Sequence, residues 1–344
     1  MPDDPRAAPP PAYGGESYHG IPALNKSPWG FSVGAYIFIG GLSGAAQLLA
    51  TLARRLDRQS GGTVLRNARY IALGGSAIGA ALLVWDLRTP QRFYNMFRIF
   101  RPTSPMSIGT YVLSTFGASS AIGAVAEFLA ARFGRRRTAA LQRAADMAQL
   151  PAAVSGAGMS VYTASLLAAT STPLWAAAPR ELAARFGTGA VAAGAAALSL
   201  GERLGGHDRT ADALDRVAAL ATVANLAATA AHESRIRAAG VRPGIGDAAA
   251  GLGAAMLHEV APLLGYALAS VSPRAGRDLS VLSSIALLAG GLLTRAEIIS
   301  SGNHTADRPQ TSLRFAQPEN LPRTGLARRW RQGQRGRSFP HDQR

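Results

Sequence analysis

Eight apolar stretches, each about as long as a membrane is thick, constrain the fold of this 344-residue chain more than any other feature. A helix needs roughly 20 mostly apolar residues to cross the hydrocarbon core of a bilayer. The stretches are 29–53, 67–86, 105–131, 147–171, 183–202, 211–231, 248–270 and 278–300. We therefore predict an all-α integral membrane protein, a bundle of about eight transmembrane helices with a basic polar C-terminal tail.

Two of these stretches are less distinct than the others. Residues 183–202 and 211–231 are rich in alanine, and the second stretch carries Asp215 and Arg216. Charged groups within a span face the interior of a bundle rather than lipid. Two interpretations stay open for each stretch: a helix that faces lipid, or a helix buried inside the bundle.

Small residues recur at four-residue spacing within the apolar stretches, as in Gly40/Gly44 and Gly75/Gly79. Transmembrane helices pack by close backbone approach through such residues. A soluble helix loses roughly 1 kcal/mol for each interior glycine relative to alanine. The spacing therefore favours a transmembrane bundle over a soluble alanine-rich helical protein.

Charge is sparse and unevenly placed. Charged residues make up 16% of the chain, against roughly 25% in soluble domains, and the net charge is +16. The arginines cluster between the apolar stretches, as in membrane loops, and form no stripe beside aromatic residues, which argues against nucleic-acid binding. The chain has no cysteine, which excludes disulfides, thiolate zinc sites and cysteine-ligated iron–sulfur clusters.

Three regions follow from this pattern: a polar N-terminal segment at 1–28, a transmembrane domain at 29–300, and a basic extended tail at 301–344. The first segment lacks the basic-then-apolar arrangement of a cleaved signal peptide. Lysine and arginine counts do not determine the orientation, since removing the two long ends reverses the bias. The tail composition suits contact with a partner protein or with acidic lipid headgroups.

The connection at residues 86–107, DLRTPQRFYNMFRIFRPTSPMS, is unusually charged for a segment between two spans. Four of its apolar residues fall on one helical face, which predicts a short interfacial helix. They are Phe93, Met96, Phe97 and Phe100. Thr103 or Ser104 is placed to cap the next helix, with Pro105 in its first turn.

This connection resembles the NrfD-like family, the membrane subunits of polysulfide reductase and related respiratory complexes. The family's run pairs D-L-x-x-P-x-R-F-x-N-M with T-S-P-M-S-x-G. The matching residues here are Asp86, Leu87, Pro90, Arg92, Phe93, Asn95, Met96, Thr103 to Ser107 and Gly109. Further similarity lies in YHGIPALNKSPWGFSVGAYIFIGGLSG, in VYTASLLAATSTPLW and in LLTRAEIISSGNHTADRP. The resemblance runs from about residue 18 to 310.

The chain departs from the family pattern at several positions. Ala164 stands where glycine is usual, Thr305 stands where serine is usual, and Tyr36 falls where some relatives have a histidine. Tyrosine still donates a hydrogen bond, but it is a poorer proton carrier than histidine at neutral pH. These departures leave the subfamily open.

The resemblance implies a multi-pass subunit of the bacterial inner membrane with no haem, no iron–sulfur cluster and no catalytic residue of its own. It implies an iron–sulfur (ferredoxin-like) partner subunit that relays electrons to or from a molybdopterin oxidoreductase subunit. It also implies a non-covalent quinone, menaquinone or ubiquinone. Two alternatives stay open: a membrane anchor that binds no quinone, and a proton-translocating or transport protein.

The six histidines test the haem-free expectation from the residues themselves. A dihaem subunit needs axial histidine pairs inside its helices. Only His258 lies near the middle of an apolar stretch, with His232 at the end of another. The sequences HEVAP and HESRI lack the second histidine of a zinc-protease motif. We therefore predict no metal ligands in this chain.

A quinone site needs an apolar slot for a flat ring, hydrogen-bond donors for its carbonyl oxygens and a supply of protons. We expect Tyr36 and Tyr162 in such a pocket, with Asp86, Arg88 and Arg92 at its rim. The alternatives are that the tyrosines belong to an interfacial belt, and that Asp86 and Arg92 form a structural ion pair.

Ionisable groups inside spans are costly, and so are candidates for function. We expect Glu127, His258 and Glu259 to form a proton path between the quinone pocket and bulk water. Neighbouring residues point about 100° apart on a helix, so His258 and Glu259 face different partners. Pro262 loosens their helix and admits water. The alternative is that these groups pair with neighbours such as Arg295.

Overall fold

The computed structural model describes residues 24–57, 61–87, 89–98, 100–133, 135–272 and 274–316. Within these ranges the ordered elements are all helices. They are α1 (Phe31–Leu56), α2 (Gly61–Asp86), η1 (Pro90–Phe97), α3 (Pro105–Ala130), α4 (Arg135–Ala168), α5 (Pro173–Ala176), α6 (Pro179–Leu204), α7 (Asp208–Ala238), α8 (Ile245–Ala255), η2 (Met256–Val260), α9 (Ala261–Val271), α10 (Gly276–Ala306) and α11 (Pro309–Phe315).

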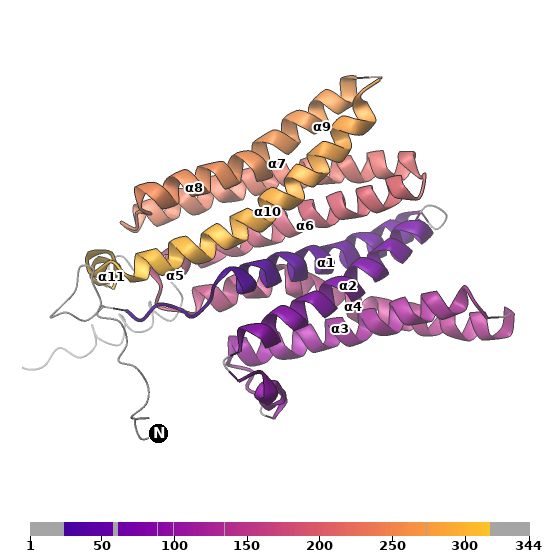
Figure 1. Ribbon diagram of the computed structural model, residues 1–344, viewed down its shortest axis with the longest axis horizontal. Coiled ribbons are helices and arrows are strands. Elements are labelled where there is room, and N and C mark those ends of the chain that lie inside the picture. Colours follow the sequence, from indigo (N-terminus) through magenta and orange to yellow (C-terminus); the bar gives the residue numbers. More distant parts are fainter. Residues whose placement is uncertain are drawn as a thin grey trace, which may run out of the picture.

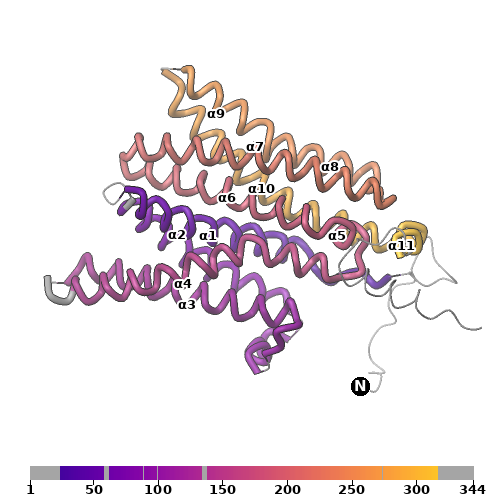
Figure 2. Tube along the Cα trace, turned by 180° about the vertical axis from the view of Figure 1, so that it is seen from behind, coloured from indigo at the N-terminus to yellow at the C-terminus, as the bar shows by residue number. Residues whose placement is uncertain are grey.

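The long helices lie side by side in an elongated bundle (Figure 1). The reverse view shows α3 and α4 on one flank and α7, α8 and α9 on the other (Figure 2). Helix α1 joins the two groups, since it packs against α2 and α4 on one side and against α6 and α10 on the other. We call α1–α4 the N-terminal half and α6–α10 the C-terminal half. The end of the bundle that carries α11 and the start of α1 is called the α11 end.

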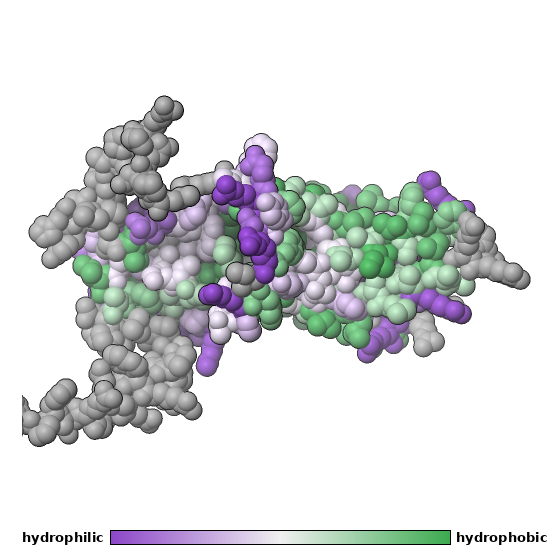
Figure 3. Space-filling view, turned by 90° about the horizontal axis from the view of Figure 1, so that it is seen from below, coloured by the Kyte–Doolittle hydropathy of each residue, from purple (hydrophilic) through white to green (hydrophobic). Residues whose placement is uncertain are grey.

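Seven helical segments in the described part of the chain are long and apolar enough to cross a membrane. They are α1, α2, α3, α4, α6, the continuous rod of α8, η2 and α9, and α10. The predicted all-α membrane fold is confirmed. Between two groups of hydrophilic residues, the surface seen from below is largely apolar, as contact with lipid requires (Figure 3).

The two indistinct stretches separate in the structure. Helix α6 contains 183–202, and about two thirds of the residues in its most apolar segment are buried inside the bundle. Helix α7, which contains 211–231, buries only one face: Leu220, Val223 and Leu226 are exposed on its outer face, whereas Asn225 and Thr229 are buried. Helix α7 is one of the longest helices, with 31 residues, but it is not among the helices apolar enough to cross a membrane. The charged residues near its start lower its mean hydropathy.

Small residues let α1 approach its neighbours closely. A Cβ at Gly44 would overlap the carbonyl oxygen of Gly156 on α4, and a Cβ at Gly75 on α2 would overlap the side chain of Ser43. The pair Gly30 and Gly34 has the same spacing, but a Cβ at Gly30 would meet nothing within 4 Å. The packing through small residues is therefore confirmed at the α1–α4 and α1–α2 crossings.

The charged connection folds as a 3₁₀-helix, η1, rather than as the α-helix implied by the shared apolar face. A 3₁₀-helix has three residues per turn, so the spacing of an α-helical face does not hold. Phe100 lies beyond η1 and packs edge-to-face on Tyr111, with 4.9 Å between ring centroids. Of the two capping candidates, Ser104 caps α3, since its Oγ accepts a hydrogen bond from the Ser107 amide at 3.3 Å.

The prediction of an extended tail from residue 301 is wrong for residues 301–315, most of which are helical. Helix α10 continues to Ala306, and Phe315 of α11 joins the hydrophobic core. The cause is burial of small and polar residues: a Cβ at Gly302 would overlap the indole of Trp175, and Thr305 is fully buried. The polarity of these residues is the reason why the sequence predicted a tail here. Residues 1–23 and 317–344 lie outside the described part.

Candidate functional site

Tyr36 of α1 and Tyr162 of α4 meet inside the N-terminal half, where their hydroxyl groups hydrogen-bond to each other. Tyr36 is only 2% exposed, and Tyr162 is half-buried. The close α1–α4 crossing at Gly44 and Gly156 places the two rings within reach. The two expected pocket tyrosines are therefore in contact, and neither is an isolated belt residue.

A cavity of about 170 Å³ lies beside this pair, and we call it the tyrosine cavity. Its walls come from α1, α2, η1, α3 and α4. Leu83, Phe97 and Leu113 are among its apolar residues, and its lining is mostly apolar. A dry cavity of roughly 150 Å³ holds a benzene ring, so this one has room for a single flat ring.

Asp86 is the part of the expected rim that lines the tyrosine cavity, at the exposed end of α2. Arg92 is exposed on η1 and does not line it. Within the described residues no ion pair joins Asp86 to Arg92, so the structural ion pair held open for them is not formed. Arg88 lies outside the described residues.

Two residues of the tyrosine cavity were not anticipated. Thr163 is 2% exposed, lines the cavity, and its Oγ1 has no hydrogen-bond partner. Gly109 of α3 lies against the ring of Tyr162 so closely that a Cβ there would overlap it. Both belong to motifs already noted, VYTAS and T-S-P-M-S-x-G, but only the helix packing reveals what they touch.

His258 and Glu259 are buried in η2, a π-helical turn between α8 and α9. The Ala261 amide bonds back to the carbonyl of Met256, and Pro262 has no amide hydrogen to continue the α-helical ladder. The helix is therefore widened where Pro262 was expected to loosen it.

The two side chains face different neighbours, as predicted. His258 Nδ1 lies 3.0 Å from the carbonyl oxygen of Leu287 on α10. Glu259 Oε1 accepts hydrogen bonds from Asn225 Nδ2 at 2.8 Å and Thr229 Oγ1 at 2.7 Å on α7. The second oxygen of Glu259, Oε2, is buried and has no partner.

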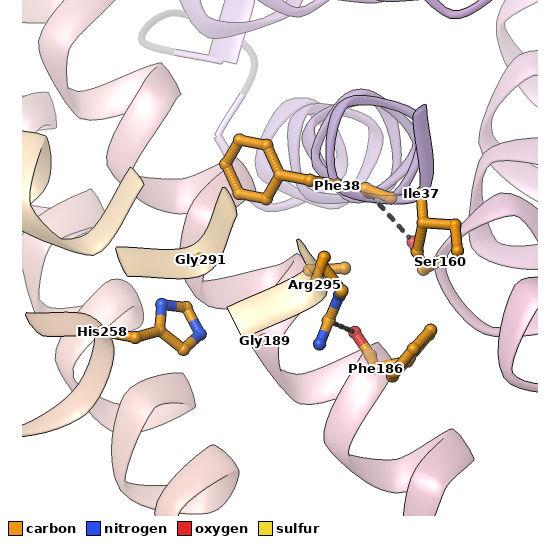
Figure 4. A pocket seen from close by; sticks show the side chains of 10 residues that line it. Ile37, Phe38, Ser160, Phe186, Gly189, His258, Gly291 and Arg295 are labelled. Atoms are coloured by element: carbon orange, nitrogen blue, oxygen red, sulfur yellow. Dashed lines mark hydrogen bonds between the residues drawn. The ribbon is translucent and has the colours of Figure 1, made fainter. Parts of the chain in front are cut away.

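Arg295 lies beside His258 but is held by a different residue (Figure 4). Its guanidinium stacks over the ring of Phe186, 4.0 Å from the centroid, and donates to the Phe186 carbonyl oxygen at 3.1 Å. Within the described residues no ion pair joins Arg295 to Glu259. The cavity between Arg295 and His258 measures about 10 Å³, close to the minimum for one water molecule.

Glu127 does not join these two groups. Its Oε2 pairs with Nη1 of Arg69 at 2.5 Å, in a network with Asp146 and Gln149 at the end of the N-terminal half opposite the α11 end. A buried arginine attracts whichever carboxylate lies opposite it, and Glu127 of α3 faces α2 rather than the C-terminal half. A single path through Glu127, His258 and Glu259 is therefore not formed.

Within the described residues, no three His, Cys, Asp or Glu side chains lie close enough together to hold a metal ion. Both the tyrosine cavity and the surroundings of Glu259 combine burial with an unpartnered polar group, Thr163 Oγ1 in the first and Glu259 Oε2 in the second.

Comparison with known proteins places the chain in a family. The family described as Polysulphide reductase, NrfD, matches residues 21–231, which include Tyr36, Asp86 and Tyr162. Protein NrfD of Escherichia coli (strain K12) is 31% identical over 91 residues, which make up 26% of this chain and 29% of that relative. The chain thus aligns with less than a third of the relative's length. Because the family match covers more than half of the chain, this multi-pass membrane protein belongs to the NrfD polysulphide reductase family.

Proposed function

We propose that the protein is a quinone-interacting membrane anchor subunit of a respiratory oxidoreductase complex in the bacterial inner membrane. In this role it exchanges electrons between the quinone pool and a partner enzyme that contains an iron–sulfur (ferredoxin-like) subunit and a molybdopterin subunit. The observation that carries the proposal is the tyrosine cavity, an apolar slot with unused hydroxyl hydrogens at its wall.

The residues of the tyrosine cavity fit a quinone ring. Tyr36 and Tyr162 carry two hydroxyl hydrogens, and their mutual hydrogen bond uses one of them. The other hydrogen, and that of Thr163, are available to a carbonyl oxygen of a ligand. Leu83 and Phe97 flank the slot with the apolar surface that a flat ring needs.

The chemistry divides between this chain and its partners. A bound quinone supplies the capacity to take up or release two electrons and two protons. Tyr36, Tyr162 and Thr163 orient its carbonyl oxygens by donating hydrogen bonds, and the apolar walls exclude water. Asp86, at the exposed end of α2, exchanges protons between the cavity mouth and water. A cluster on the partner would supply the electron exchange with a quinone held in this cavity.

The surface around η1 suits contact with such a partner or with the lipid boundary. Trp85 is 84% exposed, and Phe93, Tyr94 and Phe97 are exposed beside it. Aromatic residues are favoured both at protein interfaces and at the membrane–water boundary. A cluster held by a partner at this surface would lie next to the tyrosine cavity.

The test is to purify the chain in lipid nanodiscs and to measure menaquinone and ubiquinone bound to it. Removing one phenolic hydroxyl, in Tyr36→Phe or Tyr162→Phe, deletes a hydrogen bond of about 1 kcal/mol and weakens binding roughly fivefold. Tyr70→Phe is the control, because Tyr70 is exposed on α2 and does not line the cavity. If the wild-type protein binds neither quinone, the proposal fails, and the alternative of a membrane anchor that binds no quinone is favoured.

A further inference from the structure

A second cavity, of about 530 Å³, lies in the C-terminal half, and we call it the Arg185 cavity. Its mouth at the α11 end is formed where α7 ends and α8 begins, and carries Arg237, Arg242 and Asp247. Its inner part is lined by Arg185 of α6, His232 of α7 and Ala255 of α8. The cavity thus runs from an exposed charged rim into the membrane-spanning part of the bundle.

The inner part contains buried polar groups that the protein leaves without partners. The guanidinium of Arg185 makes no hydrogen bond and no ion pair with any described residue, although the residue is only 7% exposed. Both ring nitrogens of His232, which is 3% exposed, are also unpartnered. Leaving such groups dry costs several kcal/mol in a membrane, and the cavity has room for several water molecules. The geometry therefore requires water.

A stripe of polar residues connects this cavity to Glu259. Asn225, Thr229 and His232 follow each other at spacings of four and three, which places them on one buried face of α7. His232 lines the cavity, while Thr229 and Asn225 bond to Glu259. Ala255, on the cavity wall, precedes Glu259 by one helical turn. Glu259 therefore lies one turn beyond the cavity's inner end.

The charged groups around Glu259 come from each neighbouring helix. Arg185 of α6 is close enough to act electrostatically on Glu259, on His232 and on Glu297 of α10. Glu233 of α7 also acts on Glu259. A fixed positive charge beside a carboxylate that keeps one oxygen free is an arrangement suited to reversible protonation.

Beyond Glu259 the route closes. His258 and Arg295 fill the space towards α1, and the gap between them measures only about 10 Å³. Arg295 keeps its guanidinium on Phe186, so a fixed positive charge stands at this point. Arginine side chains act as electrostatic barriers to protons in membrane pores.

We infer that the Arg185 cavity is a water-filled half-channel that opens at the α11 end and exchanges protons with Glu259, beyond which His258 and Arg295 close it. Any coupling of this exchange to a quinone reaction rests on the proposed function, whereas the half-channel rests on the geometry of the C-terminal half alone. The proton-exchanging group is Glu259, and Arg185 is a positioning residue.

The absence of cysteine from the natural sequence makes water access directly measurable. Ala255→Cys puts a thiol on the cavity wall, and Met256→Cys puts one on the adjacent residue, which is 50% exposed and does not line the cavity. The probe is the membrane-impermeant anion methanethiosulfonate ethylsulfonate, applied to sealed vesicles of either orientation. The thiolate attacks its sulfenyl sulfur, a mixed disulfide forms, and methanesulfinate leaves.

We expect Ala255→Cys to react at least about tenfold faster than Met256→Cys, because the reactive thiolate forms in water and not in lipid. The reaction should occur only when the reagent is on the side of the α11 end. Equal rates for the two variants, or reaction of Ala255→Cys from the opposite side, would overturn the half-channel.

The role of Glu259 is tested by infrared difference spectra of the chain in nanodiscs between two pH values. A carboxyl band present in the wild type should vanish in Glu259→Gln and persist in Glu127→Gln, the matched control whose carboxylate is paired with Arg69. Persistence of that band in Glu259→Gln would overturn the assignment. Neither measurement involves quinone, so failure here leaves the proposed function standing, and failure of quinone binding leaves the half-channel standing.

Discussion

Two buried arginines, Arg69 in the N-terminal half of the bundle and Arg185 in the C-terminal half, differ in whether they have partners. In the N-terminal half, Arg69 is 3% exposed and bonds to Glu127, Asp146 and Gln149. In the C-terminal half, Arg185 is nearly as buried and bonds to no described residue. A satisfied buried charge is part of the framework, whereas an unsatisfied one needs water or a ligand. Partnership rather than burial therefore separates a structural arginine from a functional one.

The same contrast holds for the two cavities. The tyrosine cavity is small and mostly apolar, and its polar groups are neutral hydroxyls with the single carboxylate of Asp86 at the mouth. The Arg185 cavity is larger, and beside its apolar residues it carries several cationic and acidic side chains. The first suits a flat apolar ring and the second suits water and protons.

The largest expected effect separates the two arginines. Arg69→Leu removes the partner of Glu127 and should lower the free energy of unfolding by about 3 kcal/mol. This value is at the low end for breaking a buried ion pair, because the second partner of Arg69, Asp146, is half exposed. Arg185→Leu should change it by less than about 1 kcal/mol, because no bond is lost. Denaturation in detergent measures both. Equal destabilisation by the two variants would contradict the contrast between Arg69 and Arg185.

A smaller effect is expected from filling the space behind Tyr162. The added Cβ of Gly109→Ala would overlap the tyrosine ring and push it into the tyrosine cavity, at a cost of about 1–3 kcal/mol. Bound quinone should fall roughly tenfold or more. Gly74→Ala is the matched control, because a Cβ there meets nothing within 4 Å. If both variants retain quinone equally, Tyr162 is not part of the binding site.

The smallest effect concerns Thr163. Since its Oγ1 has no partner within the protein, Thr163→Val should leave the free energy of unfolding unchanged or slightly raise it. Quinone binding should weaken by about 1 kcal/mol, or roughly fivefold, through the lost hydrogen bond. Thr222→Val serves as control, because the Thr222 hydroxyl donates to the carbonyl of Ala218 on its own helix. A stability loss without a change in affinity would place the hydroxyl in the framework instead.

Much of the fold was predictable because it depends on local composition. The length of each apolar stretch determines whether it spans a bilayer, and Ser104 with Pro105 determines where α3 begins. The exceptions are informative. Residues 301–316 were predicted to belong to an extended tail because they are polar, and polarity can be seen in the sequence. The burial of Thr305 and Phe315 cannot be seen there, because it depends on contacts with distant parts of the chain.

The residues of the candidate site also divide into those that the sequence predicts and those that only the structure reveals. Its tyrosines and Asp86 were predictable, because they carry hydrogen-bonding groups at the edges of apolar stretches, in motifs with a known resemblance. Thr163, Gly109 and Arg185 were not, because nothing along the chain says which side chain meets a cavity or lacks a partner. Glu127 was misplaced for the same reason, since its partner Arg69 lies 58 residues away.

The residue pattern alone thus determined that this is an all-α membrane bundle, where its long helices lie, and which residue types are available for chemistry. Only the tertiary structure decided which of these residues meet, that Arg69 is satisfied and Arg185 is not, and that the route from the α11 end stops at Arg295. The physical reason is that hydropathy is a property of a segment. Whether a buried polar group has a partner depends on the register and crossing of helices that are far apart in the sequence.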